Sequence, residues 1–233
     1  MSMIHFVGGE KGGVGKSVMA RLLSQYFLDH GQRYAALDAD RSHATLSRYY
    51  AEFTQPLDLE RFEEADRIME TALEADCAVL IDLPAQSQRF LQRWIEDNDV
   101  LGLCEQMQIP VVYWYVVDDG VDSTDLLDQF LAAFGEDLHC VAVKNLGCGA
   151  DFGAIEALPA LQGETARAHQ MTLPALHAET MRRIDRRGLS FWAAANLSDG
   201  DGPRMGLMER QRARVWLRKA YAGIDKALAP LSA

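Results

Sequence analysis

Residues 3–17 read MIHFVGGEKGGVGKS. The run Met3–Gly9 is short and apolar, which predicts a buried strand. A glycine-rich segment follows it, and beyond Ser17 apolar side chains recur at helical spacing. These apolar positions are Met19, Leu22, Leu23, Tyr26 and Phe27. We therefore expect a strand, a glycine-rich loop and a helix in direct succession.

The loop EKGGVGKS, residues 10–17, carries the chemistry of a phosphate site. Its glycines let the backbone wrap around a polyphosphate with successive N–H groups pointing inward, and the helix that begins near Lys16 adds its positive end. Lys16 supplies a charge for the β- and γ-phosphates, and the Ser17 hydroxyl suits a Mg²⁺ ligand. A plain glycine turn is the alternative, but it needs no lysine-serine pair. The expected cofactor-binding residues of the loop are Gly12, Gly13, Val14, Gly15, Lys16, Ser17 and Val18.

Further strands and helices alternate along the chain. Gly31 ends the first helix, and Arg33–Asp40 (RYAALDAD) predicts a second strand that ends in carboxylates. Other apolar runs occur at residues 77–83, 110–117, 138–143 and 170–173. This alternation is typical of an α/β fold with a doubly wound, mostly parallel sheet and helices on both faces. We expect one P-loop domain over residues 1–233, with a linker-like stretch at Ser198–Pro203 and a last helix at about 203–229.

Three charged or glycine-rich loops fall at the carboxyl ends of the predicted strands, at residues 8–17, 38–45 and 82–86. Open α/β sheets bind ligands at that edge, so these loops should form one site. Asp82 would hold Mg²⁺ through a water, and Asp40 would orient the attacking water. Asp38 would assist Mg²⁺ hydration, with helix capping as the alternative. The expected metal-binding residues are therefore Ser17, Asp38 and Asp82.

The loop also departs from the strict pattern GxxxxGK[ST], because Glu10 stands where the first glycine belongs. With Lys11 it resembles the deviant Walker A motif KGGxxK[ST] of the ParA/MinD family of P-loop ATPases, in which the extra lysine is the signature. That family tolerates a non-glycine residue, usually glutamine, before this lysine. The carboxylate of Glu10 is thus a departure from the family pattern.

Two further segments carry the resemblance. DADRSHAT at residues 38–45 is similar to the family's switch I, which begins DxD and ends in AT, although Arg41 and Ser42 replace the usual Pro-Gln. VLIDLPA at residues 79–85 is similar to its Walker B strand and switch II, with Asp82 as the acid. The likeness extends from residue 3 to about residue 195 and is most specific over the first 85 residues.

Asn145, in VKNLG, matches the asparagine that reads the adenine in this family. Leu173 and Pro174 resemble the next element beside the base. A strand-terminal asparagine before Gly147 is also common in plain turns, which is the alternative.

The resemblance implies a nucleotide switch that binds ATP with Mg²⁺ and hydrolyses it slowly. Two subunits would sandwich ATP, each Lys11 reaching the partner's phosphates, and Lys11, Lys16 and Asp40 would be the catalytic residues. The ATP-bound homodimer would bind non-specific DNA, a membrane or a partner protein until ADP forms. In that family the activity serves plasmid or chromosome partition, or the placement of cellular machinery.

A metabolic ligase of the dethiobiotin or cobyrinate amide synthase type shares the fold and the loop, and is the alternative function. Lys11 followed by Gly12 and Gly13 favours the switch. Stimulation by DNA or a partner protein, rather than by a small acid, would separate the two. A bacterial tyrosine kinase is disfavoured because the chain has no tyrosine-rich tail, and without a helix-turn-helix extension we expect no sequence-specific DNA binding.

The composition, 48% hydrophobic and 24% charged over 233 residues, is that of a globular protein. The given N-terminus shows no basic region followed by a long apolar stretch, no segment supplies about 18 consecutive apolar residues, and the four cysteines form no CxxC pair, so we expect a cytoplasmic protein. A net charge of −11 argues against wholesale coating of nucleic acid. Arginine clusters at residues 182–187 and 204–219 are solvated faces or local polyanion contacts.

Three smaller predictions concern packing. Trp192 and Trp216 are expected in the core. The last helix should cover the sheet with Leu217, Tyr221, Ile224 and Leu228, which recur at helical spacing. The acidic string at residues 118–128 lacks the spacing of a calcium loop, and we interpret it as a helix start.

Overall fold

The structure, a computed structural model, describes residues 2–135, 138–198 and 204–231. Within these residues seven strands form one sheet in the order β3-β2-β4-β1-β5-β6-β7, and every neighbouring pair is parallel. The predicted α/β fold with a doubly wound sheet is confirmed, and the sheet is wholly parallel.

Six strands lie close to the apolar runs that predict them: β1 Met3–Gly8, β2 Tyr34–Asp38, β4 Ala78–Asp82, β5 Val111–Val117, β6 His139–Asn145 and β7 Ala168–Leu173. No apolar run marks β3 (Thr54–Pro56), because it is a three-residue edge strand with two exposed residues. Its terminal Pro56 suits an edge, where one N–H needs no partner.

The connections are helical. The α-helices are α1 Lys16–Asp29, α2 Thr45–Tyr49, α3 Phe62–Ala65, α4 Arg67–Glu74, α5 Gln88–Asp97, α6 Val100–Gln106, α7 Val121–Phe134, α8 Gly153–Glu156, α9 Ala178–Arg187, α10 Phe191–Asn196 and α11 Leu207–Leu228. Short 3-10 turns are η1 Ala51–Phe53, η2 Pro159–Leu161 and η3 Ala229–Leu231.

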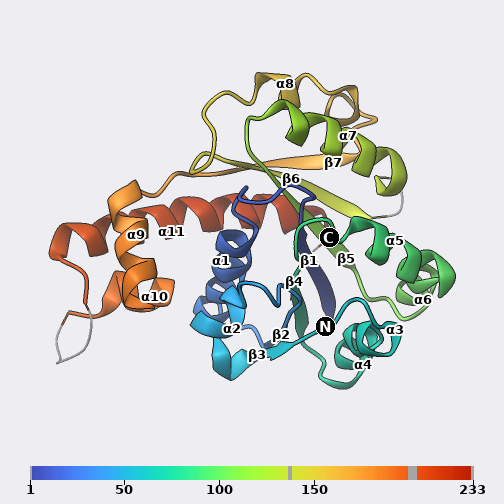
Figure 1. Ribbon diagram of the computed structural model, residues 1–233, viewed down its shortest axis with the longest axis horizontal. Coiled ribbons are helices and arrows are strands. Elements are labelled where there is room, and N and C mark those ends of the chain that lie inside the picture. The colour runs from blue at the N-terminus through green and yellow to red at the C-terminus, as the bar shows by residue number, and fades with distance from the viewer. Residues whose placement is uncertain (1, 136–137, 199–203, 232–233) are drawn as a thin grey trace.

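Each face of the sheet has its own apolar core. One core packs α1, α2 and α9–α11 against the sheet through side chains such as Leu22 and Phe191. The other packs α4–α8 against the opposite face through side chains such as Trp94 and Phe130. Figure 1 shows these two helical layers around the sheet. Burying one such side chain contributes about 2–3 kcal/mol, so both layers hold the sheet rigid beneath its loops.

The strand register brings the three predicted loops to one edge. β1 lies between β4 and β5, with Val7 opposite Asp82, and Asp38 of β2 is also opposite Asp82. The loops after β1, β2 and β4 therefore leave the sheet side by side, at the point where the strand order reverses.

The first half of α11 contacts α9 and α10 beyond the sheet, and its second half packs along β7. We call α9, α10 and the first half of α11 the arm; it projects from the sheet in Figure 1. Trp216 is buried in α11, as predicted, but Trp192 in α10 is 48% exposed, so the core prediction for Trp192 was wrong. An aromatic residue in an apolar stretch does not reveal that its helix sits on a projecting arm.

The linker-like stretch predicted at Ser198–Pro203 lies, except for Ser198, outside the described residues. Helix α11 begins at Leu207, and its packing face includes Leu217 and Ile224, both buried. No helix among the described residues is both long and apolar enough to cross a membrane.

Candidate functional site

The glycine-rich loop between β1 and α1 has backbone N–H groups that are free to bind a ligand. Among the described residues, no hydrogen bond occupies the N–H groups of residues 12–17. Helix α1 begins at Lys16 and has no side-chain cap, so the positive end of its dipole adds to these donors. Free, inward-pointing amides at a helix N-terminus are a site for an anion such as phosphate.

Two glycines of the loop, Gly15 and Gly12, differ in whether the chain leaves room for a side chain. Gly15 has a left-handed backbone (φ 97°), and a Cβ there would lie 2.2 Å from Nδ2 of Asn145. Only glycine fits this turn. A Cβ on Gly12 would meet no atom of the described residues within 4 Å apart from its chain neighbours, so their packing does not require a glycine there.

Lys16 already lies inside the loop. Its side chain is buried, and Nζ donates a hydrogen bond to the Lys11 carbonyl at 2.8 Å. Burial lowers the pKa of Lys16, against the opposite effects of Asp82, Asp40 and Glu10. The ammonium is thus held where a bound phosphate can replace the carbonyl as its partner.

Asp82 at the end of β4 has an environment that is unusual for a carboxylate. It is fully buried, and neither oxygen accepts a hydrogen bond from the described residues. Burial, and next the charge of Asp38, raise the pKa of Asp82 to about 8, against the lowering effects of Ser17 and Lys16. A buried carboxylate without a partner, near a serine hydroxyl, fits a hydrated Mg²⁺. The predicted Ser17 and Asp82 are therefore brought together, and their donor set suits the ion.

Asp38 has a different environment although it is next to Asp82 in the register. Its Oδ2 accepts from the Ser47 N–H at 2.8 Å, in the first turn of α2, and its Oδ1 accepts from the Asp40 N–H at 3.2 Å. Both oxygens are therefore used by backbone groups, as in the helix-capping alternative. The role in Mg²⁺ hydration stays a prediction.

Asp40 is turned into its own loop. Its Oδ1 accepts from the N–H groups of Ser42 (3.1 Å) and His43 (3.2 Å), and the His43 ring lies 3.1 Å from Oδ2. The carboxylate shapes the loop after β2, close enough to Lys16 to act on its charge. Its role toward an attacking water also stays a prediction.

The Lys11 side chain reaches the end of β5. Its Nζ lies 3.0 Å from Asp118 Oδ2, and this Asp118 also accepts from the Ser123 hydroxyl and the Gly120 N–H. Although burial acts in the other direction, these hydrogen bonds hold the pKa of Asp118 below its usual range. Asp118 belongs to the acidic string predicted to be a helix start, but α7 begins only at Val121. The signal that marks Asp118 is its place at a strand end on the loop edge.

A cleft of about 700 Å³ opens beside the glycine-rich loop. It brings together three predicted residues from three elements, Val18 of α1, Asn145 of β6 and Pro174 after β7. Its walls are mainly apolar, as a nucleobase requires. The predicted base-side residues therefore share one cavity next to the phosphate loop.

Asn145 connects the wall of this cleft to the glycine-rich loop by a hydrogen bond. Its Nδ2 donates to the Val14 carbonyl at 2.8 Å, and its Oδ1 accepts from the Gly147 N–H at 2.9 Å. The hydrogen bond from the Gly147 N–H is the one expected if Asn145 only stabilises a turn, which was the alternative interpretation. The adenine contact stays a prediction, and it needs one of these hydrogen bonds to be exchanged for the base.

The proteins that this chain resembles match it over nearly its whole length. No family model matches it. It is 28% identical to Protein TraL of Escherichia coli over 243 residues, a match that covers 97% of this chain and 99% of that protein. Its fold is similar to a chain of the MinC:MinD cell division protein complex of Aquifex aeolicus, with a TM-score of 0.59 and 12% identity over 93% of this chain and 94% of that chain.

A candidate plasmid partition protein of Borrelia burgdorferi B31, bound to AMPPNP, has a TM-score of 0.54 and 15% identity, covering 94% of this chain and 99% of that one. These neighbours have the P-loop NTPase fold, and the loop EKGGVGKS carries the lysine of the deviant motif. The chain therefore shares its fold with MinD and with this partition protein, and its loop EKGGVGKS resembles the deviant phosphate-loop motif.

Proposed function

We propose that this chain is an ATP-driven switch that binds ATP with Mg²⁺, dimerises around it and hydrolyses it slowly. Nucleotide binding in general is supported by the open loop, by Lys16 and by the P-loop neighbours. The observation that carries the switch is the position of Lys11. This lysine is 31% exposed and pairs with Asp118 after β5, which leaves Lys16 as the lysine whose ammonium lies within the loop.

The residues divide the work as follows. Lys16 and the amides of the loop bind the phosphates, and Ser17 with Asp82 holds the ion, which supplies positive charge at the phosphates. Asp40 orients the attacking water. Lys11 of the second subunit completes the site across the interface.

The dimer has a direct test at Gly12. Because the single chain leaves open space around this residue, a Gly12→Val protein should fold and still bind ATP. If two loops meet across a two-fold axis, the valine must clash with the second subunit and block the ATP dimer. We would measure the mass by light scattering, with and without ATP and Mg²⁺, beside phosphate release.

Asp40→Asn is the matched control. Asparagine keeps an oxygen for the Ser42 and His43 amides, so the loop should hold its shape, but the base that orients water is lost. This variant should bind ATP, stay dimeric and release phosphate more slowly. A wild type that stays monomeric with ATP, or a dimer indifferent to Gly12→Val, would remove the switch and favour the ligase.

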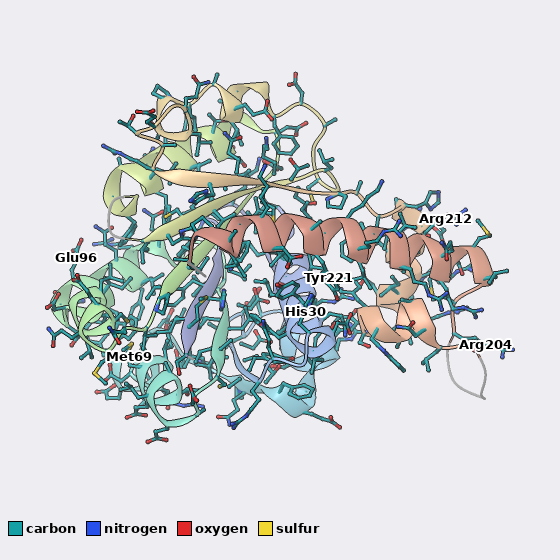
Figure 2. All side chains as sticks on the ribbon, turned by 180° about the vertical axis from the view of Figure 1, so that it is seen from behind. His30, Met69, Glu96, Arg204, Arg212 and Tyr221 are labelled. Atoms are coloured by element: carbon teal, nitrogen blue, oxygen red, sulfur yellow. The ribbon has the colours of Figure 1, made fainter. Side chains whose placement is uncertain are left out.

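The basic residues of the arm suggest what the ATP-bound protein binds, which we call its cargo. Arg212, Arg214, Arg218 and Lys219 of α11 make no ion pair with a described residue, whereas Arg182 and Arg186 of α9 both pair with Glu179. Figure 2 places Arg204 and Arg212 at the end of the molecule opposite Glu96. A basic end on a chain of net charge −11 suits a local polyanion contact.

We propose non-specific DNA as the first ligand of this basic end and a partner protein as the second, in plasmid partition or in positioning of cellular machinery within the cytoplasm. Binding of a random duplex should need ATP and weaken steeply with salt. Arg212→Glu with Arg214→Glu should abolish that binding while ATP turnover is kept. Salt-insensitive or absent DNA binding would leave the partner protein as the cargo.

A further inference from the structure

Glu10, the residue that breaks the phosphate-loop pattern, makes a long-range hydrogen bond. Its Oε1 accepts from the backbone N–H of Gln88 at 2.9 Å, across 78 positions of sequence. Gln88 is the first residue of α5, whose N–H groups have no partner within the helix. A carboxylate at this place also interacts favourably with the helix dipole.

Helix α5 has no other side-chain cap. Ser87 occupies the capping position, but its hydroxyl donates to the Pro84 carbonyl at 2.9 Å and caps nothing. The phosphate loop therefore supplies, through Glu10, the cap that the local sequence of α5 lacks.

This contact fixes the far end of the segment that follows β4. The near end is Asp82, close to Ser17, and the far end is Gln88, bound to Glu10. Residues 83–87 thus begin beside β1, where the Leu83 N–H donates to the Val7 carbonyl, and end at a hydrogen bond to the loop residue Glu10. Because Lys11, the next residue, is bound to Asp118 on the β5 side, the tip of the loop is tied to neighbours on both sides of β1.

We propose that Glu10 is a positioning residue that couples the phosphate loop to α5, so that movement of the loop on nucleotide binding is carried to that helix. This inference rests on the proposed function of the same site. The charge of Glu10 has a separate effect, since it lies near enough to Lys16 to act on it and repels the phosphates. The hydrogen bond from Gln88 and the negative charge are two separate properties of Glu10, and suitable substitutions remove one without the other.

Three variants and the wild type together cover every combination of the hydrogen bond and the charge. Glu10→Gln keeps the acceptor and removes the charge, Glu10→Asp keeps the charge but is one methylene too short for Gln88, and Glu10→Ala removes both. Amide exchange in the first turn of α5 should be unchanged in Glu10→Gln and about fivefold faster in Glu10→Asp and Glu10→Ala, the effect of losing a helix cap. ATP affinity should follow charge instead, rising about fivefold in Glu10→Gln and Glu10→Ala.

The coupling itself is measured as the change in α5 exchange when ATP and Mg²⁺ are added. Wild type and Glu10→Gln should show this change, and Glu10→Asp and Glu10→Ala should lose it while still binding ATP, which a purely structural cap would not cause. Circular dichroism confirms folding of each variant. An α5 response that persists in Glu10→Ala, or exchange in Glu10→Asp equal to wild type, would overturn the proposal. A wild type that binds no ATP would remove the proposed function and the coupling, while exchange without nucleotide still decides whether Glu10 holds α5.

Discussion

Replacing Asp82 by asparagine should stabilise the nucleotide-free protein, although it removes a predicted metal-binding residue. The reason is that both carboxylate oxygens are buried without a partner among the described residues. Asparagine has nearly the same shape and carries no charge. The site is therefore strained electrostatically when no cation is present.

The size of the effect follows from the pKa. Burial and the neighbouring Asp38 raise the pKa of Asp82 from 3.8 to about 8. Between these two values the folded protein keeps a proton that the unfolded chain has released, so the free energy of unfolding falls as the pH rises. The loss begins near pH 4 and is complete above pH 8. At about 1.4 kcal/mol per pKa unit the upper bound is about 6 kcal/mol, and entry of water into the site reduces this to about 2–4 kcal/mol.

The assay is thermal and denaturant unfolding in a chelator at pH 5 and pH 8. At pH 8 Asp82→Asn should melt about 5–10 °C above wild type, since 1 kcal/mol corresponds to about 2–4 °C in a domain of this size. At pH 5 the gap should be much smaller, because wild-type Asp82 is then protonated. ATP with Mg²⁺ should raise the melting temperature of wild type and have less effect on the variant.

Asp38→Asn is the control, because Asp38 is the register neighbour of Asp82 but accepts from two backbone N–H groups. Losing that charged acceptor costs about 1–2 kcal/mol, while removing the Asp38 charge relieves part of its repulsion of Asp82, so Asp38→Asn should gain much less stability at pH 8 than Asp82→Asn. The reasoning is refuted if Asp82→Asn is no more stable than wild type at pH 8, or if its gain is the same at pH 5.

Three further outcomes are expected. Lys16→Ala should fold but lose ATP binding by calorimetric titration with Mg²⁺, because the charge inside the loop is gone; near-native affinity would contradict the phosphate site. ATP should compete better than GTP, since the Asn145 amide offers both a donor and an acceptor to the adenine edge, and equal affinities would count against a base contact. Asp118→Ala should release Lys11 and let the ATP dimer form at up to about fivefold lower protein concentration in light scattering, the scale of a partly exposed ion pair; an unchanged midpoint would mean that the pair does not restrain Lys11.

The strands and the glycine-rich loop between β1 and α1 could be predicted because their signals are local. A buried parallel strand is a continuous apolar run, and the glycines of residues 12–17 stand next to the lysine and serine with which they act. The order of these elements also indicates which strand ends share an edge of the sheet. The edge strand β3 escaped prediction because three partly exposed residues produce no pattern.

Two contacts that shape the site could not be predicted from spacing. Glu10 reaches Gln88 over 78 positions and Lys11 reaches Asp118 over 107, so neither pair leaves a local trace. Both depend on the β4-β1-β5 order, which brings the loops on either side of β1 within reach of its tip.

Asp38 and Asp82 show the same limit most clearly. In the sequence each is an aspartate at the end of an apolar strand, and the local pattern assigns both to the metal. In the fold Asp38 accepts hydrogen bonds from the amides of Ser47 and Asp40, whereas neither oxygen of the buried Asp82 has a hydrogen-bond partner among the described residues. Residue type and strand position fix where a carboxylate stands along the chain, but its partners and its solvation come from segments that only folding brings beside it.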